Sequence, residues 1–126
     1  MKQRDIDIVL NNPANWDKLK NATVLVTGAT GRLGIYIVHS LLQASRRWGL
    51  NIQVLALARN SEKIKTVYGK VLNEINTLEQ DITLPISWEG PVDYIFHTAG
   101  LASPEDFTHR PTDTMWGHVQ GTRNIL

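Results

Sequence analysis

Three glycines spaced three residues apart form the part of this sequence best suited to chemistry. Gly28, Gly31 and Gly34 stand between a β-branched run at 23–27 and a stretch whose apolar residues recur at helical spacing. Gly28 allows a tight turn off a strand, Gly31 keeps a Cβ out of a ligand's path, and Gly34 allows close helix packing. Unpaired N–H groups at the helix N-terminus would face an anion. The pattern predicts a pyrophosphate site; a Walker A loop is excluded because no Gly-Lys-Ser/Thr follows.

The end of the next predicted strand bears on which dinucleotide such a turn would hold. NAD-binding turns of this kind are paired with an acidic residue about 20 residues further on, which binds the ribose hydroxyls. Here the strand ends in Ala58 and Arg59, without a carboxylate. Arg59 together with Arg32 could flank a 2′-phosphate, which favours NADP over NAD. The alternative is that Arg59 is a solvated loop cation and that Asn60 or Ser61 meets a ribose.

Composition excludes several other kinds of site. The 126 residues include no cysteine, so a disulfide, a thiolate nucleophile and a cysteine-ligated metal are all excluded. No histidine stands three or four residues from another, so the chain offers no helical pair of metal ligands. A formal charge of +1 gives no reason to expect nucleic acid as a partner. No stretch approaches the roughly 18 apolar residues of a membrane span, and no apolar segment follows the first residues, so we expect a cytoplasmic protein without membrane contact.

Strand and helix patterns alternate from residue 22 onward. Strands are predicted at 23–27, 52–58, 75–78 and 92–98. Helices are predicted from Leu33 to a left-handed cap at Gly49, from a cap at Ser61, and from Pro111 or Thr112 to the end of the chain. On the last helix, one apolar stripe is expected, formed by Met115, Val119, Thr122 and Leu126.

This alternation predicts an α/β fold. Strands separated by helices imply a parallel sheet with right-handed crossovers, here in the order 3-2-1-4. That order describes the N-terminal part of a Rossmann-type doubly wound sheet. We therefore expect an NAD(P)-binding domain at 22–126, incomplete on its C-terminal side because such a sheet has further strands. Residues 1–21 are expected to be a short lead-in that packs Trp16 on the domain, with a disordered tail as the alternative.

Four segments carry a family resemblance when they are taken in order. They are the glycine-rich turn at 27–34, the Asp-Ile pair at 81–82, the strand and turn at 92–100 with its His-x-Ala, and the Gly-Thr-containing segment at 119–126. Together they resemble the extended short-chain dehydrogenase/reductases, in particular the NAD-dependent epimerase/dehydratase group that acts on nucleotide sugars. The resemblance covers about residues 22 to 126.

The resemblance implies where a dinucleotide cofactor, NAD or NADP, would lie. The residues around the pyrophosphate would be Gly28, Thr30, Gly31, Arg32, Leu33 and Gly34. The residues of the adenosine side would be Arg59, Asp81 and Ile82, and those of the nicotinamide side Thr98, Ala99 and Gly100. Without the family, Asp81 reads equally well as a turn aspartate ahead of Pro85. His97 is assigned no chemistry.

The sequence also departs from this family. His118 stands where the family usually has asparagine, and no tyrosine is followed by lysine at the fourth residue, so the family's Tyr-x-x-x-Lys acid–base pair is missing. In the family that pair follows the helix on which this chain ends. The chain thus resembles the N-terminal portion of a longer nucleotide-sugar enzyme and is expected to bind cofactor without turnover. The alternatives are a non-catalytic NAD(P)-sensing regulator or interaction module, and a Rossmann-like domain without a retained ligand. Family dimers use the last helix, so a homodimer is expected.

Overall fold

One parallel sheet forms the centre of the structure. The computed structural model describes residues 3–101 and 103–126, and its 4-stranded sheet has the order β3-β2-β1-β4, as predicted. The strands are β1 (Thr23–Thr27), β2 (Gln53–Ala58), β3 (Asn76–Glu79) and β4 (Tyr94–His97). All three pairings are parallel, with Val24 of β1 opposite Val54 on one side and Tyr94 on the other. The chain therefore has the expected Rossmann-type arrangement.

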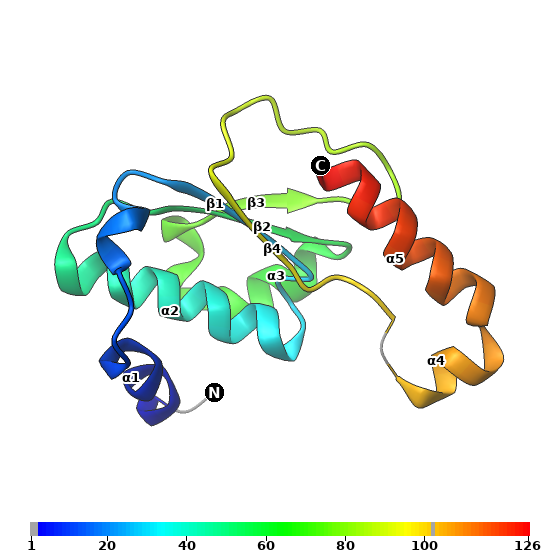
Figure 1. Ribbon diagram of the computed structural model, residues 1–126, viewed down its shortest axis with the longest axis horizontal. Helices are drawn as coiled ribbons and strands as arrows, with labels where there is room; N and C mark the ends of the chain where they lie inside the picture. The colour runs from blue at the N-terminus through cyan, green and yellow to red at the C-terminus, as the bar shows by residue number, and fades with distance from the viewer. Residues whose placement is uncertain (1–2, 102) are drawn as a thin grey trace.

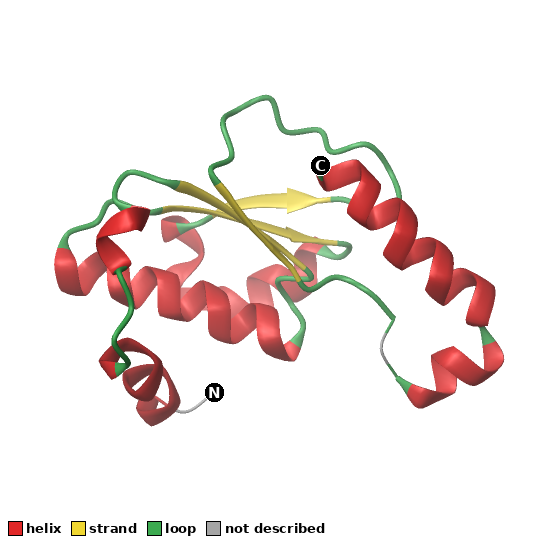
Figure 2. Ribbon diagram, in the orientation of Figure 1, coloured by secondary structure: helices red, strands yellow, loops and turns green. Residues whose placement is uncertain are grey.

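Helices cover one face of this sheet (Figures 1 and 2). They are α2 (Arg32–Trp48) and α3 (Ser61–Tyr68), which is followed by the 3-10 helix η2 (Gly69–Glu74). Alternate residues of β1 and β2, such as Val26 and Ala56, pack against Val38 of α2 and Ile64 of α3 in one buried cluster. Every residue of β1 is buried, which confirms a strand covered on both faces.

The opposite face carries a smaller apolar cluster. Leu25, Leu55 and Leu57 project to this side and are packed by Trp88 of the loop after β3 and by Ile125 of α5 (Pro111–Ile125). A short helix, α4 (Pro104–His109), precedes α5 and was not predicted. Its start follows from local chemistry, because Ser103 caps it by accepting the N–H of Asp106 at 3.1 Å.

The lead-in packs on the domain, as predicted. Helix α1 (Gln3–Asn11) buries Ile6 and Leu10, and the 3-10 helix η1 (Trp16–Leu19) follows it. The Tyr36 hydroxyl of α2 donates to Asp5 at 2.9 Å. The Trp16 ring stacks on Trp48 at the end of α2, with 5.7 Å between ring centroids. These contacts join α1 and η1 to the outer side of α2.

Helix ends partly follow the predicted caps. Gly49 ends α2 in the left-handed region at φ 63°, as expected. The predicted cap at Ser61 is wrong, because the preceding Asn60 caps α3 by accepting the N–H of Lys63 at 2.9 Å. Asn60 can do so because its side chain reaches the same orphan N–H groups from an extended backbone, while Ser61 is already helical.

The last helix presents its predicted apolar stripe to the outside. Met115 is 60% exposed and Val119 62%, whereas the buried residues of α5 are Thr114 and Gly121. Strand β4 is an edge strand, with Ile95 40% exposed. In the parts of the chain that the structure describes, no helix is both long and apolar enough to cross a bilayer.

Replacing Gly34 with alanine should destabilise the fold. A Cβ at Gly34 would meet the Gly28 carbonyl oxygen and would lie 2.8 Å from the Ala29 Cα, and neither backbone atom can move away easily. We expect Gly34→Ala to lower the free energy of unfolding by about 1–3 kcal/mol, measured by chemical denaturation. Gly117→Ala is the control, because nothing lies within 4 Å of its Cβ. Alanine there should raise stability by about 0.5–1 kcal/mol through helix propensity. Equal stability of the two variants would contradict this account.

Candidate functional site

The glycine-rich turn lies against the end of β4. Gly28 follows β1 with φ 64°, and a Cβ there would lie 2.8 Å from both the N and Cα of Ala99. No other residue type fits this contact, since the conformation is left-handed and the neighbouring atoms are backbone. Gly28 therefore brings the turn and the segment 98–100 to one place at the carboxyl edge of the sheet.

The N-terminus of α2 presents unpaired donors at this edge. Gly31 precedes the helix in an extended conformation, with no side-chain cap, and its own N–H donates to the Gly28 carbonyl at 2.8 Å. None of the backbone hydrogen bonds described for residues 3–101 and 103–126 uses the N–H of Arg32, Leu33 or Gly34. Such groups, together with the helix dipole, attract an anion.

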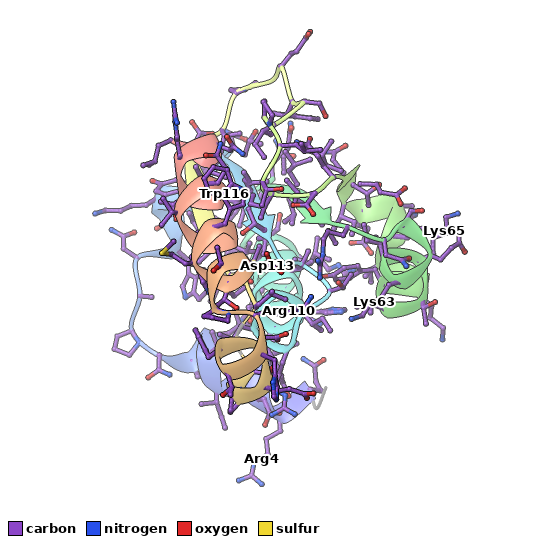
Figure 3. The ribbon with its side chains drawn as sticks, turned by 90° about the vertical axis from the view of Figure 1, so that its right-hand side faces the viewer. Arg4, Lys63, Lys65, Arg110, Asp113 and Trp116 are labelled. Carbon is purple, nitrogen blue, oxygen red and sulfur yellow. The ribbon has the colours of Figure 1, made fainter. Side chains whose placement is uncertain are left out.

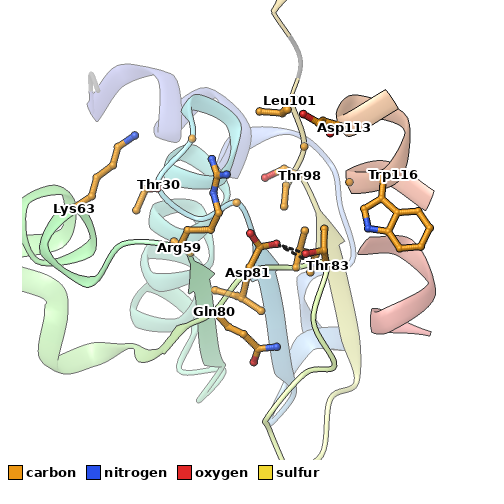
Figure 4. Close-up of a pocket in the computed structure, with 18 of the residues that line it drawn as sticks. Thr30, Arg59, Lys63, Gln80, Asp81, Thr83, Thr98, Leu101, Asp113 and Trp116 are labelled. Atoms are coloured by element: carbon orange, nitrogen blue, oxygen red, sulfur yellow. Dashed lines mark hydrogen bonds between the residues drawn. The ribbon is translucent and has the colours of Figure 1, made fainter. Parts of the chain in front are cut away.

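A cavity of about 430 Å³ opens beside this turn. It lies at the carboxyl ends of the strands, where doubly wound sheets bind their ligands. Most of the residues predicted to hold a cofactor line it, namely Gly28, Thr30, Gly31, Arg59, Asp81, Ile82, Thr98, Ala99 and Gly100. Arg59 and Lys63 stand on one side, and Asp113 and Trp116 on the other (Figure 4). The structure thus brings together residues that are far apart in the sequence, and the hydrogen bond between Thr27 and Ala99 alone joins residues 72 positions apart.

Three of the predicted residues do not line the cavity. Arg32 and Leu33 are exposed, Leu33 by 68%, and Gly34 is buried against Gly28 and Ala29. The suggestion that Arg32 joins Arg59 at a phosphate has no support from this geometry. Arg32, Leu33 and Gly34 could contact a ligand only through their backbone N–H groups. The role of these three residues in binding a cofactor stays a prediction.

Asp81 forms a turn and also lies on the wall of the cavity. Its Oδ1 accepts the Thr83 N–H at 2.9 Å and the Thr83 hydroxyl at 2.8 Å, so it forms a turn. It also lines the cavity. The Thr83 hydrogen bonds, with a smaller effect from the nearby Arg59 charge, lower the pKa of the Asp81 carboxyl below its usual value. Ile82 beside it is 7% exposed and packs closely on Gly121 of α5.

A single hydroxyl joins the ends of β1 and β4 beneath the cavity. The buried Thr27 Oγ1 accepts the N–H groups of Thr98 at 3.1 Å and Ala99 at 3.2 Å, and it lies 2.7 Å from Nδ1 of His97. Because the oxygen already accepts two N–H groups, its own hydrogen is the one directed at His97. The other ring nitrogen, Nε2 of His97, is buried and has no hydrogen-bond partner among the described residues. His97 does not line the cavity.

Further lining residues come from segments without a recognised motif. They are Leu57, Ala58, Lys63, Gln80, Thr83, Leu101, Arg110, Asp113, Trp116 and Gly117. Figure 3 shows Arg110, Asp113 and Trp116 along α4 and α5, with Lys63 on the separate helix α3. His118, the departure from the family pattern, has its Nε2 3.1 Å from the Leu101 carbonyl oxygen. One signal in the sequence points to Lys63, namely its place on the predicted short helix after Arg59.

The fold and the site define a Rossmann-type domain with a dinucleotide-binding turn. The chain belongs to the NAD dependent epimerase/dehydratase family, whose model matches residues 24–126. Membership of this family implies NAD or NADP as the cofactor. Within the described residues, no group of three or more His, Asp or Glu side chains is placed to hold a metal ion.

The chain is also similar to individual curated proteins. The chain is 31% identical over 109 residues to UDP-glucuronic acid decarboxylase 6 of Arabidopsis thaliana, covering 84% of this chain and 29% of the relative. It is 32% identical over 114 residues to the uncharacterized membrane protein MJ1061 of Methanocaldococcus jannaschii, covering 85% and 32%. A probable NADP-dependent dehydrogenase of Haemophilus influenzae is 28% identical over 109 residues, covering 78% and 40%. The chain therefore spans less than half the length of these curated relatives.

Solved structures share the fold. The oxidoreductase yciK from E. coli superposes with a TM-score of 0.63 at 20% identity, covering 91% of this chain and 53% of that one. A putative short chain dehydrogenase from Escherichia coli CFT073 gives a TM-score of 0.62 at 19% identity, covering 90% and 58%. These similarities establish the doubly wound architecture.

Stability should fall as the pH drops below neutrality. Burial, and secondarily the neighbouring His118, lowers the pKa of His97 below its ordinary value of 6.5, and burial likewise lowers the pKa of His39. Just below pH 6.5 these histidines are therefore protonated in the unfolded chain and still neutral in the folded chain, which favours unfolding. We expect a lower free energy of unfolding by urea at pH 5.5 than at pH 7.5. His97→Gln should show a smaller decrease, since His39 alone then contributes. An identical decrease in both proteins would contradict the assignment to His97.

Proposed function

We propose that this chain is the NADP-binding part of an oxidoreductase that modifies nucleotide sugars. The observation that carries the proposal is the cavity at the carboxyl edge of the sheet. The glycine-rich turn and the segment 98–100 both line it. Arg59, which follows β2, and Asp81, which follows β3, also line it. This is the position at which doubly wound sheets bind dinucleotides.

The described residues fit such a ligand. Gly28 and Gly31 line the cavity with backbone alone, and the N–H groups at the start of α2 lack backbone acceptors, so they can hold a pyrophosphate. In the proposal Asp81 and Ile82 lie at the adenine, and Thr98 to Gly100 lie along the nicotinamide side. When bound, the nicotinamide supplies hydride transfer, and the residues of this chain bind and orient it.

The preference for NADP rests on two cations. Arg59 and Lys63 both line the cavity, and no ion pair described for residues 3–101 and 103–126 includes either of them. No carboxylate stands directly at the end of β2 to bind a ribose 2′-hydroxyl, and Asn60 is engaged in capping α3. The relative in Haemophilus influenzae is described as a probable NADP-dependent dehydrogenase, which supports the same preference.

The substrate class follows from the relatives. Several are UDP-glucuronic acid decarboxylases, so we assign a nucleotide sugar to the complete protein. The 126 residues contain no Tyr-x-x-x-Lys pair. In the proposal, residues 22–126 form a cofactor domain without its catalytic part, and 1–21 form the lead-in.

We also propose that the chain forms a homodimer, which would be detected as self-association in solution. Helix α5 exposes Met115 and Val119, and the adjoining β4 leaves one edge of the sheet unpaired. Sedimentation at increasing concentration should show dimers, and Val119→Glu should weaken them about tenfold or more by burying a charge at the contact. Ile8→Glu is the control, since Ile8 is 54% exposed on the distant α1. A monomer at every concentration would overturn the proposed dimer.

Arg59→Ala should reduce binding of NADP more than binding of NAD. Loss of a charge-assisted hydrogen bond to the 2′-phosphate costs about 1.5–3 kcal/mol, or roughly tenfold to a hundredfold in Kd. Isothermal titration with NADP⁺ and NAD⁺ should show this loss for NADP⁺ only. Lys65→Ala is the matched control, because Lys65 lies on α3 but is paired with Glu62 at 2.7 Å. Wild-type preference for NAD⁺, unchanged in Arg59→Ala, would overturn the NADP assignment.

A further inference from the structure

A tyrosine from α3 holds the glycine-rich turn. The hydroxyl of Tyr68, the last residue of α3, donates to the Ala29 carbonyl oxygen at 2.5 Å. Both residues are buried, Tyr68 with 2% and Ala29 with 0% of its surface exposed. The N–H of Ala29 donates in turn to the Leu57 carbonyl of β2 at 3.1 Å. Ala29 is thus fixed by β2 through its N–H and by α3 through its carbonyl.

The Tyr68 hydroxyl replaces a backbone donor. A buried carbonyl needs a hydrogen-bond partner, and in an unbroken helix the Ala29 carbonyl would accept the N–H of Leu33, four residues on. Here Gly31 is extended, with ψ 166°, and the helix begins only at Arg32. None of the backbone hydrogen bonds described for residues 3–101 and 103–126 uses the Leu33 N–H. The extended Gly31 thus leaves the Leu33 N–H available to an anion, and the Tyr68 hydroxyl satisfies the buried carbonyl in its place.

The surroundings of Tyr68 make this contact rigid. Its ring packs in the main core cluster with Ile64, and the His39 ring of α2 lies 5.7 Å away between centroids. Burial raises the pKa of the Tyr68 hydroxyl far above its usual value, so it stays protonated and keeps its hydrogen for donation. The same helix carries Lys63 in its first turn, on the wall of the cavity. Helix α3 thus connects the cationic side of the cavity with the turn.

We propose that Tyr68 is a positioning residue that keeps the glycine-rich turn in its pyrophosphate-binding conformation. The inference rests on the proposed function, since it concerns the same cavity. Tyr68 does not line the cavity and acts through Ala29. Without the hydroxyl, the Ala29 carbonyl would accept a hydrogen bond from the N–H groups at the start of α2. Those N–H groups would then no longer be available to bind the ligand.

The test measures ligand binding at the glycine-rich turn independently of binding at the adenosine side of the cavity. Tyr68→Phe keeps the ring and removes only the hydroxyl. Two probes are titrated by calorimetry: NADP⁺, which carries the pyrophosphate, and adenosine 2′-monophosphate, which does not. The Kd for NADP⁺ should rise about five- to tenfold, the size expected for one hydrogen bond, while that for the monophosphate should stay within about twofold. In the absence of ligand, amide hydrogen exchange at 29–33 should become faster.

Tyr94→Phe is the matched control. The Tyr94 hydroxyl also donates to a backbone carbonyl, that of Lys18 at 3.2 Å, but at the amino end of β4. It should leave the Kd of both probes unchanged. Equal weakening of both probes by Tyr68→Phe, or none, would overturn the inference while the wild-type protein still binds NADP⁺. Failure of the wild-type protein to bind NADP⁺ would overturn the proposed function and this inference with it.

Discussion

The close approach of two strand ends sets the geometry of the whole site. Gly28 touches the backbone of Ala99 at a distance that leaves no room for a Cβ, and the Thr27 hydroxyl bonds the same segment. Both contacts depend on β1 and β4 being parallel neighbours, so that their carboxyl ends coincide. If these strands moved apart, the turn and the segment 98–100 would no longer bound one cavity. The crossover topology is therefore a precondition for ligand binding.

The site divides into a backbone part and a side-chain part. At the turn, a ligand would meet N–H groups that are fixed by the helix start and by the hydrogen bonds of Ala29. Across the cavity, Arg59 and Lys63 supply positive charge from longer, solvated side chains. Fixed dipoles need no reorganisation on binding, whereas flexible cations lose side-chain entropy. In the proposed function, the first part would hold the phosphates of any dinucleotide, and the second would distinguish NADP from NAD.

Much of this arrangement could be predicted from the sequence, because local signals determine it. The β-branched run, the glycine spacing and the cap at Gly49 identify β1, the turn and α2, and their alternation with later strands fixes the order of the sheet. The cap of α3 was misplaced by one residue, since Asn60 and Ser61 are both good caps and only the backbone conformation decides between them. Tyr68 and Trp116 carried no signal, because each reaches the turn or the cavity through tertiary packing.

The stacked pair Trp16 and Trp48 gives the lead-in an optical signature. Two indoles with centroids 5.7 Å apart couple electronically, and Arg47 lies over the Trp48 ring at 5.2 Å. Trp116 stands on the wall of the cavity, in a different part of the molecule. Near-ultraviolet circular dichroism of the Trp16–Trp48 pair therefore reports whether η1 is docked on α2, while emission from Trp116 reports on the cavity. Single tryptophan-to-phenylalanine replacements would assign each signal and allow the two regions to be followed in one sample.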